Sequence, residues 1–281
     1  MTIQDVDSSL ALGADGARPA NTGAIVRKAL KLVGNLATRF GVLIAFALLW
    51  EYGGRLGFLN SAVIPPLSDV IWALQDGLIS GPLKEDLGIS LTRAGIAFGA
   101  AAAVGIPLGL VMGQLPTIEK LIDPLLQLFR QTSALALYPV FILLLGLGET
   151  SKIFVIFWAS LFPILLATIG GVQEVDGKLI EMARVYGARR LTIFRRVVLP
   201  GAVPQIFVGL RLSATTALLM LIAAEMIGAN HGVGFQVMNA QYNFQIPLML
   251  ASIVLLALLG LAANYAILGL QRRLCRWNAA A

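Results

Sequence analysis

Histidine and cysteine are nearly absent from this chain: among its 281 residues there is one histidine, His231, and one cysteine, Cys275. One cysteine cannot form a disulfide within the chain, and the two residues together are too few for a structural zinc site with its four ligands. We therefore expect no bound metal and no cofactor. His231 lies in a predicted outer loop that holds no cysteine and no acidic residue, so a histidine-based intramembrane enzyme has little support.

Charge is also scarce. Only 13% of the residues are charged and 58% are hydrophobic, which excludes an ordinary soluble domain and is typical of a membrane protein with several spans. The net charge of +6 would also suit a nucleic-acid-binding protein. Here, however, the basic residues lie in loops between apolar segments, where they indicate membrane orientation, so we expect no nucleic-acid partner.

The beginning of the chain contains Asp5, Asp7 and Asp15 and no early apolar run, so it does not resemble a cleavable signal peptide. We expect residues 1–38 to form a cytoplasmic tail and residues 39–281 to form a transmembrane domain. Within that domain, residues 173–200 are expected to form a cytoplasmic loop.

Six segments are apolar over about 20 residues, the length that a transmembrane helix needs. They cover residues 40–57, 91–114, 121–146, 153–172, 206–227 and 247–270. The sequence therefore predicts an all-α polytopic membrane protein with about six transmembrane helices. A short helix over residues 68–79, with Ser68 or Asp69 near its N-cap, is expected on the outer face.

Basic residues in the connections set the orientation. The N-terminal segment, the second-to-third connection, the fourth-to-fifth connection and the C-terminal tail hold five, one, six and three Lys or Arg residues. The opposite side has only four: Arg55, Lys84, Arg93 and Lys152. Because cytoplasmic loops carry the excess of Lys and Arg, both termini are expected in the cytoplasm.

Small residues recur every fourth position in the second predicted span: Ala97, Ala101, Gly105, Gly109 and Gly113. Residues at this spacing share one helix face, and small side chains let another helix approach closely. This face is predicted to be a packing seam between helices.

The most polar part of any predicted span is the run Arg130, Gln131, Thr132 and Ser133. A guanidinium beside hydroxyl groups suits an oxyanion, because arginine donates hydrogen bonds in a fixed fork. We therefore predict that Arg130 and Thr132 contribute to an anion path. Alternatively, Arg130 bonds helix-end carbonyls or lipid headgroups. Pro139, further along the same span, is a candidate kink.

Arg211 and Glu225 are the ionisable residues of the fifth span. In a straight helix they are about 21 Å apart along the axis and within about 40° of the same face. They could therefore line one path at two depths. The alternatives are an interfacial anchor for Arg211 and a packing or gating hydrogen bond at the outer end for Glu225.

A basic segment, EMARVYGARRLTIFRRVVLP, runs from Glu181 to Pro200 between two predicted spans. Its apolar pattern predicts two short helices over residues 177–186 and 190–198, with Gly187 at the turn between them. Six Lys or Arg residues lie between Lys178 and Arg196, so this helix-turn-helix is expected to face the cytoplasm.

The spacing of Glu181, Ala183, Gly187, Leu199 and Pro200 resembles the EAA loop of ABC-importer permeases. Met182 and Val197 depart from the family pattern, which has Ala and Ile there. Residues 143–152, 199–211 and 223–235 and the basic tail are similar to the sulfonate, nitrate and taurine branch. The resemblance implies a type I ABC-importer permease fold with a separate ATPase docked on this loop. It also implies that Glu181, Ala183 and Gly187 position the loop, while Arg184, Arg189 and Arg190 contact acidic ATPase residues.

The same resemblance implies a permease subunit in the cell (inner) membrane that forms the pathway for a small oxyanion such as an aliphatic sulfonate, taurine or nitrate. Its expected partners are a second copy of the chain, two ATPase subunits, an external substrate-binding protein and membrane lipid. No G-x-x-x-x-G-K-[ST] motif occurs, so ATP hydrolysis is expected on another polypeptide and the chain itself is not an enzyme. A stand-alone secondary transporter or channel is the alternative, but it would need ion-coupling acids in the spans, where Glu225 alone is available.

Overall fold

The structure is a computed structural model that describes residues 41–42, 44–56, 60 and 63–275. Every regular element in these residues is a helix, which confirms the all-α fold class. Of the first predicted span, residues 41–42 and 44–55 are helical, Leu56 lies in a turn, and residues 40, 43 and 57 lie outside the described residues. The predicted tail, residues 1–38, lies outside them too.

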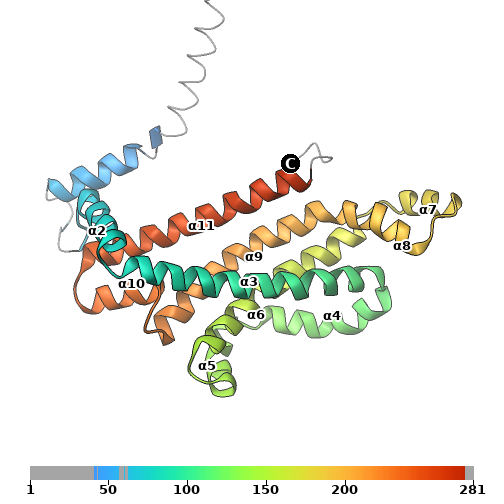
Figure 1. Ribbon diagram of the computed structural model, residues 1–281, viewed down its shortest axis with the longest axis horizontal. Helices are drawn as coiled ribbons and strands as arrows, with labels where there is room; N and C mark the ends of the chain where they lie inside the picture. Colours follow the sequence, from blue (N-terminus) through green and yellow to red (C-terminus); the bar gives the residue numbers. More distant parts are fainter. Residues whose placement is uncertain (1–40, 43, 57–59, 61–62, 276–281) are drawn as a thin grey trace, which may run out of the picture.

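Four long apolar helices form the body of the described chain: α3 (Leu83–Gln114), α6 (Glu149–Gln173), the continuous run Arg190–Gly228 and α11 (Ile246–Leu274). Each is long and apolar enough to cross a membrane, where only intrahelical bonds can satisfy the backbone. They confirm the second, fourth, fifth and sixth predicted spans. Helix α6 packs against α3 and against α9 (Leu199–Gly228), and α11 packs against α9 (Figure 1).

The third predicted span is wrong as a single helix. It is broken into α4 (Pro116–Gln131) and α5 (Ala134–Leu145), which meet at an angle of 95°. The break falls at Thr132 and Ser133 rather than at Pro139. Both residues have extended backbone, and the Thr132 hydroxyl donates to Leu128 O (2.9 Å), the carbonyl that the Thr132 N–H also uses. Hydroxyl side chains that compete for helical carbonyls in this way favour helix ends and bends.

The predicted seam on α3 is confirmed as its contact face with α6. Ala97 and Ala101 are fully buried, and a Cβ atom on Gly109 would lie 2.6 Å from Thr168 Cβ. A Cβ atom on Gly113 would lie 2.7 Å from Val172 Cβ. Only small residues let these two helices approach so closely.

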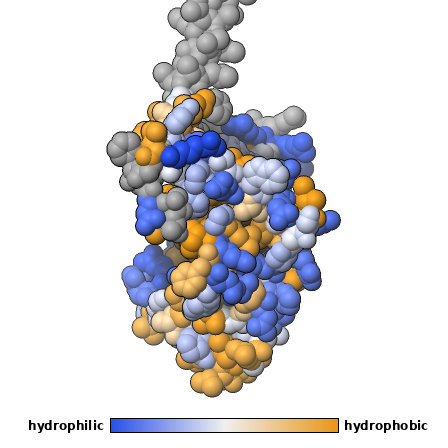
Figure 2. All heavy atoms as spheres, turned by 90° about the vertical axis from the view of Figure 1, so that its left-hand side faces the viewer, coloured by the Kyte–Doolittle hydropathy of each residue, from blue (hydrophilic) through white to orange (hydrophobic). Residues whose placement is uncertain are grey.

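Two short helices, α2 (Leu67–Ile79) and α10 (Val233–Tyr242), lie at one end of the long helices (Figure 1). Figure 2 views this end, where hydrophilic side chains are mixed with apolar ones. Helix α2 confirms the short helix predicted over residues 68–79, while its place on the outer face stays a prediction. Its N-cap is Pro66, and the Ser68 N–H instead donates to Glu51 Oε2 at 2.9 Å. The segment predicted as the last outer loop contains α10, so it is not a simple loop.

The opposite end carries the helix-turn-helix (Figure 1). Its first helix is α7 (Gly177–Val185), and its second comprises α8 (Arg190–Ile193) and a π-helical turn, η1 (Phe194–Val198). These bounds confirm the two predicted helices. The second does not stop before the fifth span, however, because η1 continues directly into α9. Pro200 has no N–H to donate to a carbonyl of the preceding turn, and the wider π-helical turn just before it is consistent with that missing hydrogen bond.

Candidate functional site

The turn between α7 and α8 is the most exposed part of the helix-turn-helix. Gly187 has φ +73°, a conformation that glycine adopts without strain, and a side chain there would meet nothing within 4 Å. The Gly187 and Ala188 N–H groups donate to Arg184 O and Ala183 O, so the turn ends α7 with its last carbonyls bonded. At the other end of α7, the Asp176 side chain accepts from the Lys178 N–H at 2.9 Å.

The predicted docking residues fall on two sides of this element. Glu181, Arg184, Arg189 and Arg190 are exposed. Ala183 instead packs inward with Ile180 on the buried side chains of Val172, Ile193 and Val198, and Leu199 and Pro200 are partly buried. Large apolar side chains remain exposed on the surface of the helix-turn-helix: Leu179, Met182, Val185, Tyr186 and Leu191. We refer to these five residues as the apolar docking patch.

A cavity of about 350 Å³ lies at the break between α4 and α5. Arg130, Thr132 and Ser133 line it from the break, and Trp158 of α6 and Thr216 of α9 line it from the helices behind. The structure thus brings Arg130 and Thr132 together on one cavity wall, as the predicted anion path requires. Whether an anion uses this path stays a prediction.

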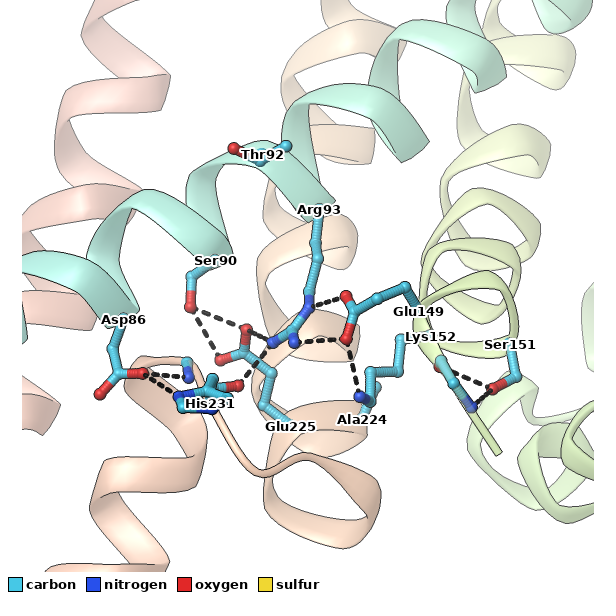
Figure 3. Close-up of polar contacts among 12 residues, drawn as sticks. Asp86, Ser90, Thr92, Arg93, Glu149, Ser151, Lys152, Ala224, Glu225 and His231 are labelled. Atoms are coloured by element: carbon cyan, nitrogen blue, oxygen red, sulfur yellow. Dashed lines mark hydrogen bonds and ion pairs between the residues drawn. The ribbon is translucent and has the colours of Figure 1, made fainter. Parts of the chain in front are cut away.

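A buried ionic cluster ties the helices together at the end that carries α10 (Figure 3). Arg93 of α3 lies at its centre. Its Nε and Nη2 donate to the two carboxylate oxygens of Glu149 on α6, with Nη2 2.7 Å from Oε1. Its Nη1 donates at 2.7 Å both to Glu225 Oε1 on α9 and to His231 O.

The remaining contacts of this cluster join α3 to the start of α10. The Ser90 hydroxyl lies 2.7 Å and 2.9 Å from the two Glu225 oxygens and accepts from the Val233 N–H. Glu225 Oε2 also accepts from the Gly234 N–H at 2.9 Å. Asp86 accepts from the Gly232 N–H and from Gln236 Nε2, both at 2.6 Å. We refer to Asp86, Ser90, Arg93, Glu149, Lys152 and Glu225 as the outer cluster.

Charge in the outer cluster is nearly balanced. Two of its three carboxylates, Glu149 and Glu225, pair with Arg93, and the Lys152 ammonium lies 3.0 Å from Glu149 Oε1. The third, Asp86, bonds Gly232 and Gln236 and lies 3.8 Å from His231 Nδ1. Glu225 is fully buried, whereas the Glu149 side chain is 56% exposed. A charge taken out of water needs such partners, so this cluster is suited to holding helix ends together. Among the residues that the structure describes, no group of His, Cys, Asp and Glu side chains could hold a metal ion.

Arg211 and Glu225 have separate partners. Arg211 Nη2 donates to Gln271 Oε1 on α11, while Glu225 belongs to the outer cluster, and whether the two line one path stays a prediction. Arg93, near the start of the second predicted span, and Lys152, just before the fourth, were counted with the charges of the opposite side. Both are buried in helices, and α6 begins at Glu149, earlier than predicted. The sequence did carry one signal for this site: Asp86, Ser90 and Arg93 are four and three residues apart, the spacing of one helix face.

Residues 105–277 match the family model of the binding-protein-dependent transport system inner membrane component. The taurine transport system permease of Escherichia coli (strain K12) is 34% identical over 243 residues, 85% of this chain and 88% of that protein. A putative aliphatic sulfonates transport permease of Bacillus subtilis (strain 168) is also 34% identical, over 82% of this chain and 83% of that protein. The bicarbonate transport system permease of Synechocystis is 31% identical, over 83% of this chain and 86% of its own length.

Among solved structures, the inward-facing MetNI methionine ABC transporter has the same fold. One of its chains superposes with a TM-score of 0.57 at 21% identity, covering 73% of this chain and 97% of that chain. This likeness supports the type I importer fold. Taken with the matched family model, it shows that the chain belongs to the family of binding-protein-dependent transport system inner membrane components.

Proposed function

We propose that this permease subunit forms the membrane pathway for a small oxyanion, such as an aliphatic sulfonate, taurine or nitrate, that an external binding protein delivers. The observation that carries the proposal is the similarity over more than four fifths of the chain to permeases named for taurine and aliphatic sulfonates. Like other permeases of this family, the subunit depends on ATP hydrolysis by separate ATPase subunits.

The ATPase partner is proposed to bind the helix-turn-helix. Exposed apolar groups gathered on a surface otherwise rich in arginine are typical of a protein interface. The apolar docking patch would be buried against the ATPase, and Arg184, Arg189 and Arg190 would pair with acidic residues around it. Glu181 would help to position the element. Ala183, Leu199 and Pro200 would act from within the fold, by holding the two helices of the element against the long helices.

The second copy of the chain is proposed to face α4. Lys120, Asp123, Gln127 and Arg130 are three or four residues apart and therefore share one face of that helix. Polar side chains on a membrane-spanning segment face protein or water rather than lipid. A homodimer with these faces toward each other would place Arg130 and Thr132 beside a shared path. For Arg211 and Glu225 a role in the path stays a prediction, since the contacts described above account for their positions.

The helix-turn-helix end is proposed to lie in the cytoplasm, with both termini on that side. The excess of Lys and Arg in the connections at this end supports the orientation. The outer cluster, α2 and α10 would then face the external binding protein.

Co-purification tests the proposed partnership. Tagged chain would be extracted from native membranes in a mild detergent, and the proteins recovered with it would be identified by mass spectrometry. We expect a P-loop ATPase in a one-to-one ratio with the chain. Recovery of the chain alone, under conditions that keep known importer complexes intact, would instead favour a stand-alone transporter or channel.

A further inference from the structure

The cavity at the α4–α5 break has a composition that selects among ligands. Among the described residues that line it, Arg130 is the one charged side chain and none is a carboxylate. Most of its wall is apolar, with Phe129, Phe162 and Leu219 among the contributors. A volume of about 350 Å³ falls within the usual range of small-molecule sites, ~300–1,000 Å³. A small organic anion with an apolar part fits this combination better than a cation does.

A second observation adds a hydrogen-bond donor. Trp158 lines the cavity, and its indole nitrogen is buried without a hydrogen-bond partner in the described part of the chain. An unmet buried donor is unfavourable, and an acceptor that reached this nitrogen through a small shift of the cavity wall would remove that penalty. The Thr132 and Thr216 hydroxyls already donate to backbone carbonyls, so they do not supply such donors.

The broken span adds further donors. Helix α5 has 12 residues, and its N-cap residue, Ser133, and its first residue, Ala134, lie on the cavity wall. The Leu137 N–H bonds to Ser133 O, so the N–H groups of residues 134–136 come before the first helical bond. Helix N-termini within broken membrane helices attract anionic groups because these free N–H groups and the helix dipole favour negative charge.

We propose that this cavity is a transit site for a short-chain organic oxyanion of the alkylsulfonate type, held by Arg130, the Trp158 N–H and the first turn of α5. The alkyl chain lies against Phe129, Phe162 and Leu219. Arginine binds the charged head through its fork, and the indole N–H supplies a third donor. This inference rests on the proposed function, which it deepens by placing the solute inside the membrane and by preferring an organic oxyanion to an inorganic one.

Uptake by the assembled complex tests the site. The chain, its co-purified ATPase and the external binding protein would be reconstituted in proteoliposomes, and ATP-driven uptake of radiolabelled butanesulfonate would be measured. Arg130→Gln is expected to lower the uptake rate at saturating binding protein by about tenfold or more, as expected for the loss of a charge-assisted hydrogen bond. Arg130→Lys is expected to keep an intermediate rate, because it retains the charge but not the fork. Trp158→Phe is expected to reduce uptake several-fold.

Two matched variants serve as controls: one removes a positive charge and the other removes an indole, each at a position away from the cavity. Arg273→Gln removes an exposed cation from α11, and Trp72→Phe alters an exposed indole on α2. Both are expected to take up butanesulfonate at the wild-type rate. Complex recovery and stimulation of ATP hydrolysis by the loaded binding protein are expected to be unchanged in Arg130→Gln and Trp158→Phe, which separates loss of binding from loss of folding.

The outcomes separate this inference from the proposed function. Wild-type uptake of butanesulfonate together with unchanged uptake in both Arg130→Gln and Trp158→Phe would overturn the transit site and leave the proposed function standing. An equal loss in Arg273→Gln would also overturn it, since loss of positive charge in general would then be responsible. A wild-type complex that takes up no oxyanion probe would overturn both.

Discussion

Arg93 and Glu225 are 132 residues apart in the sequence, yet their side chains form an ion pair at 2.7 Å with exposed fractions of 4% and 0%. Each has further partners: Arg93 also bonds Glu149 and His231 O, and Glu225 also bonds Ser90 and the Gly234 N–H. One residue of α3 therefore connects the α10-side ends of α6 and α9 with the loop before α10. We expect this part of one subunit to move as a single body during transport.

Removing the buried carboxylate tests this cluster. Glu225→Ala would leave Arg93 buried with only the partly exposed Glu149 as counter-charge, and breaking a buried ion pair typically costs ~3–5 kcal/mol. We expect a marked fall in the thermal unfolding midpoint of the purified chain. Glu149→Gln is the matched control, because that carboxylate is 56% exposed and Arg93 keeps Glu225 as a partner. Similar midpoints for the two variants would contradict the account.

Glycine 232 lies against the same carboxylate. A Cβ atom there would clash with the Glu225 carboxyl group, and φ is +123°. Gly232→Ala is therefore expected to destabilise the chain through backbone strain, ~1–3 kcal/mol, and through the clash in addition. In Gly146→Ala, φ is +84° but nothing lies within 4 Å, so only the strain is present. Detergent thermal-shift measurements should show a clearly larger loss for Gly232→Ala, and a loss no larger than that of Gly146→Ala would count against the described contact.

The seam between α3 and α6 gives another paired prediction. Gly109→Ala would place a methyl group 2.6 Å from Thr168 Cβ and 2.9 Å from Leu165 O, so the two helices would have to separate. We expect a loss of about 1–3 kcal/mol, the usual effect of overpacking. Gly99→Ala lies on the same helix with nothing within 4 Å and should be neutral or slightly stabilising. Folded yield and unfolding midpoint of the two variants check this, and equal behaviour would show that the seam does not pack as described.

The docking turn can be altered without touching the long helices. Gly187→Val forces a β-branched residue into a conformation with φ +73°, while the open space around it leaves the packed core intact. We expect normal membrane insertion and loss of ATPase co-purification. Gly177→Val is the control, because Gly177 also has open space around it but lies at the start of α7 without a positive φ. Normal recovery of the complex with Gly187→Val would contradict the proposed docking element.

The single cysteine allows a direct test of orientation. In a Cys275→Ser background, Tyr186→Cys and Tyr242→Cys place one thiol at each end of the molecule, at positions where the native side chains are 89% and 73% exposed. A membrane-impermeant maleimide added to intact cells or spheroplasts should label Cys at position 242 and not at 186. The reverse pattern would invert the proposed orientation.

The sequence predicted the parts of this fold that depend on local pattern. The long spans follow from the length of the apolar segments. The α3 seam follows from small residues at every fourth position up to Gly113, and the turn at Gly187 follows from a glycine between two amphipathic segments. Each of these signals lies within one helix or one turn, where hydrophobicity and backbone preference decide the structure.

The parts that were missed depend on contacts between distant segments. Arg93 was counted with the charges of one membrane side because a charged residue near a span end is ordinarily exposed, but Glu225 and Glu149 on two other helices allow it to be buried. The bend at Thr132 was missed because the apolar residues before and after it together reach the length of one span, although the polar run from Arg130 to Ser133 marked the break. Trp158 had no sequence signal as a candidate ligand, since an aromatic residue in a span ordinarily packs in the core.

The central claim is that this chain forms an ATP-driven import pathway for a small oxyanion. The most direct test is ATP-dependent uptake by proteoliposomes that contain the chain, its co-purified ATPase and the binding protein, with radiolabelled taurine and butanesulfonate as probes. The account predicts accumulation of at least one probe that requires both ATP and the binding protein. Uptake that proceeds without ATP, or the absence of uptake of any oxyanion by a complex that hydrolyses ATP, would contradict it.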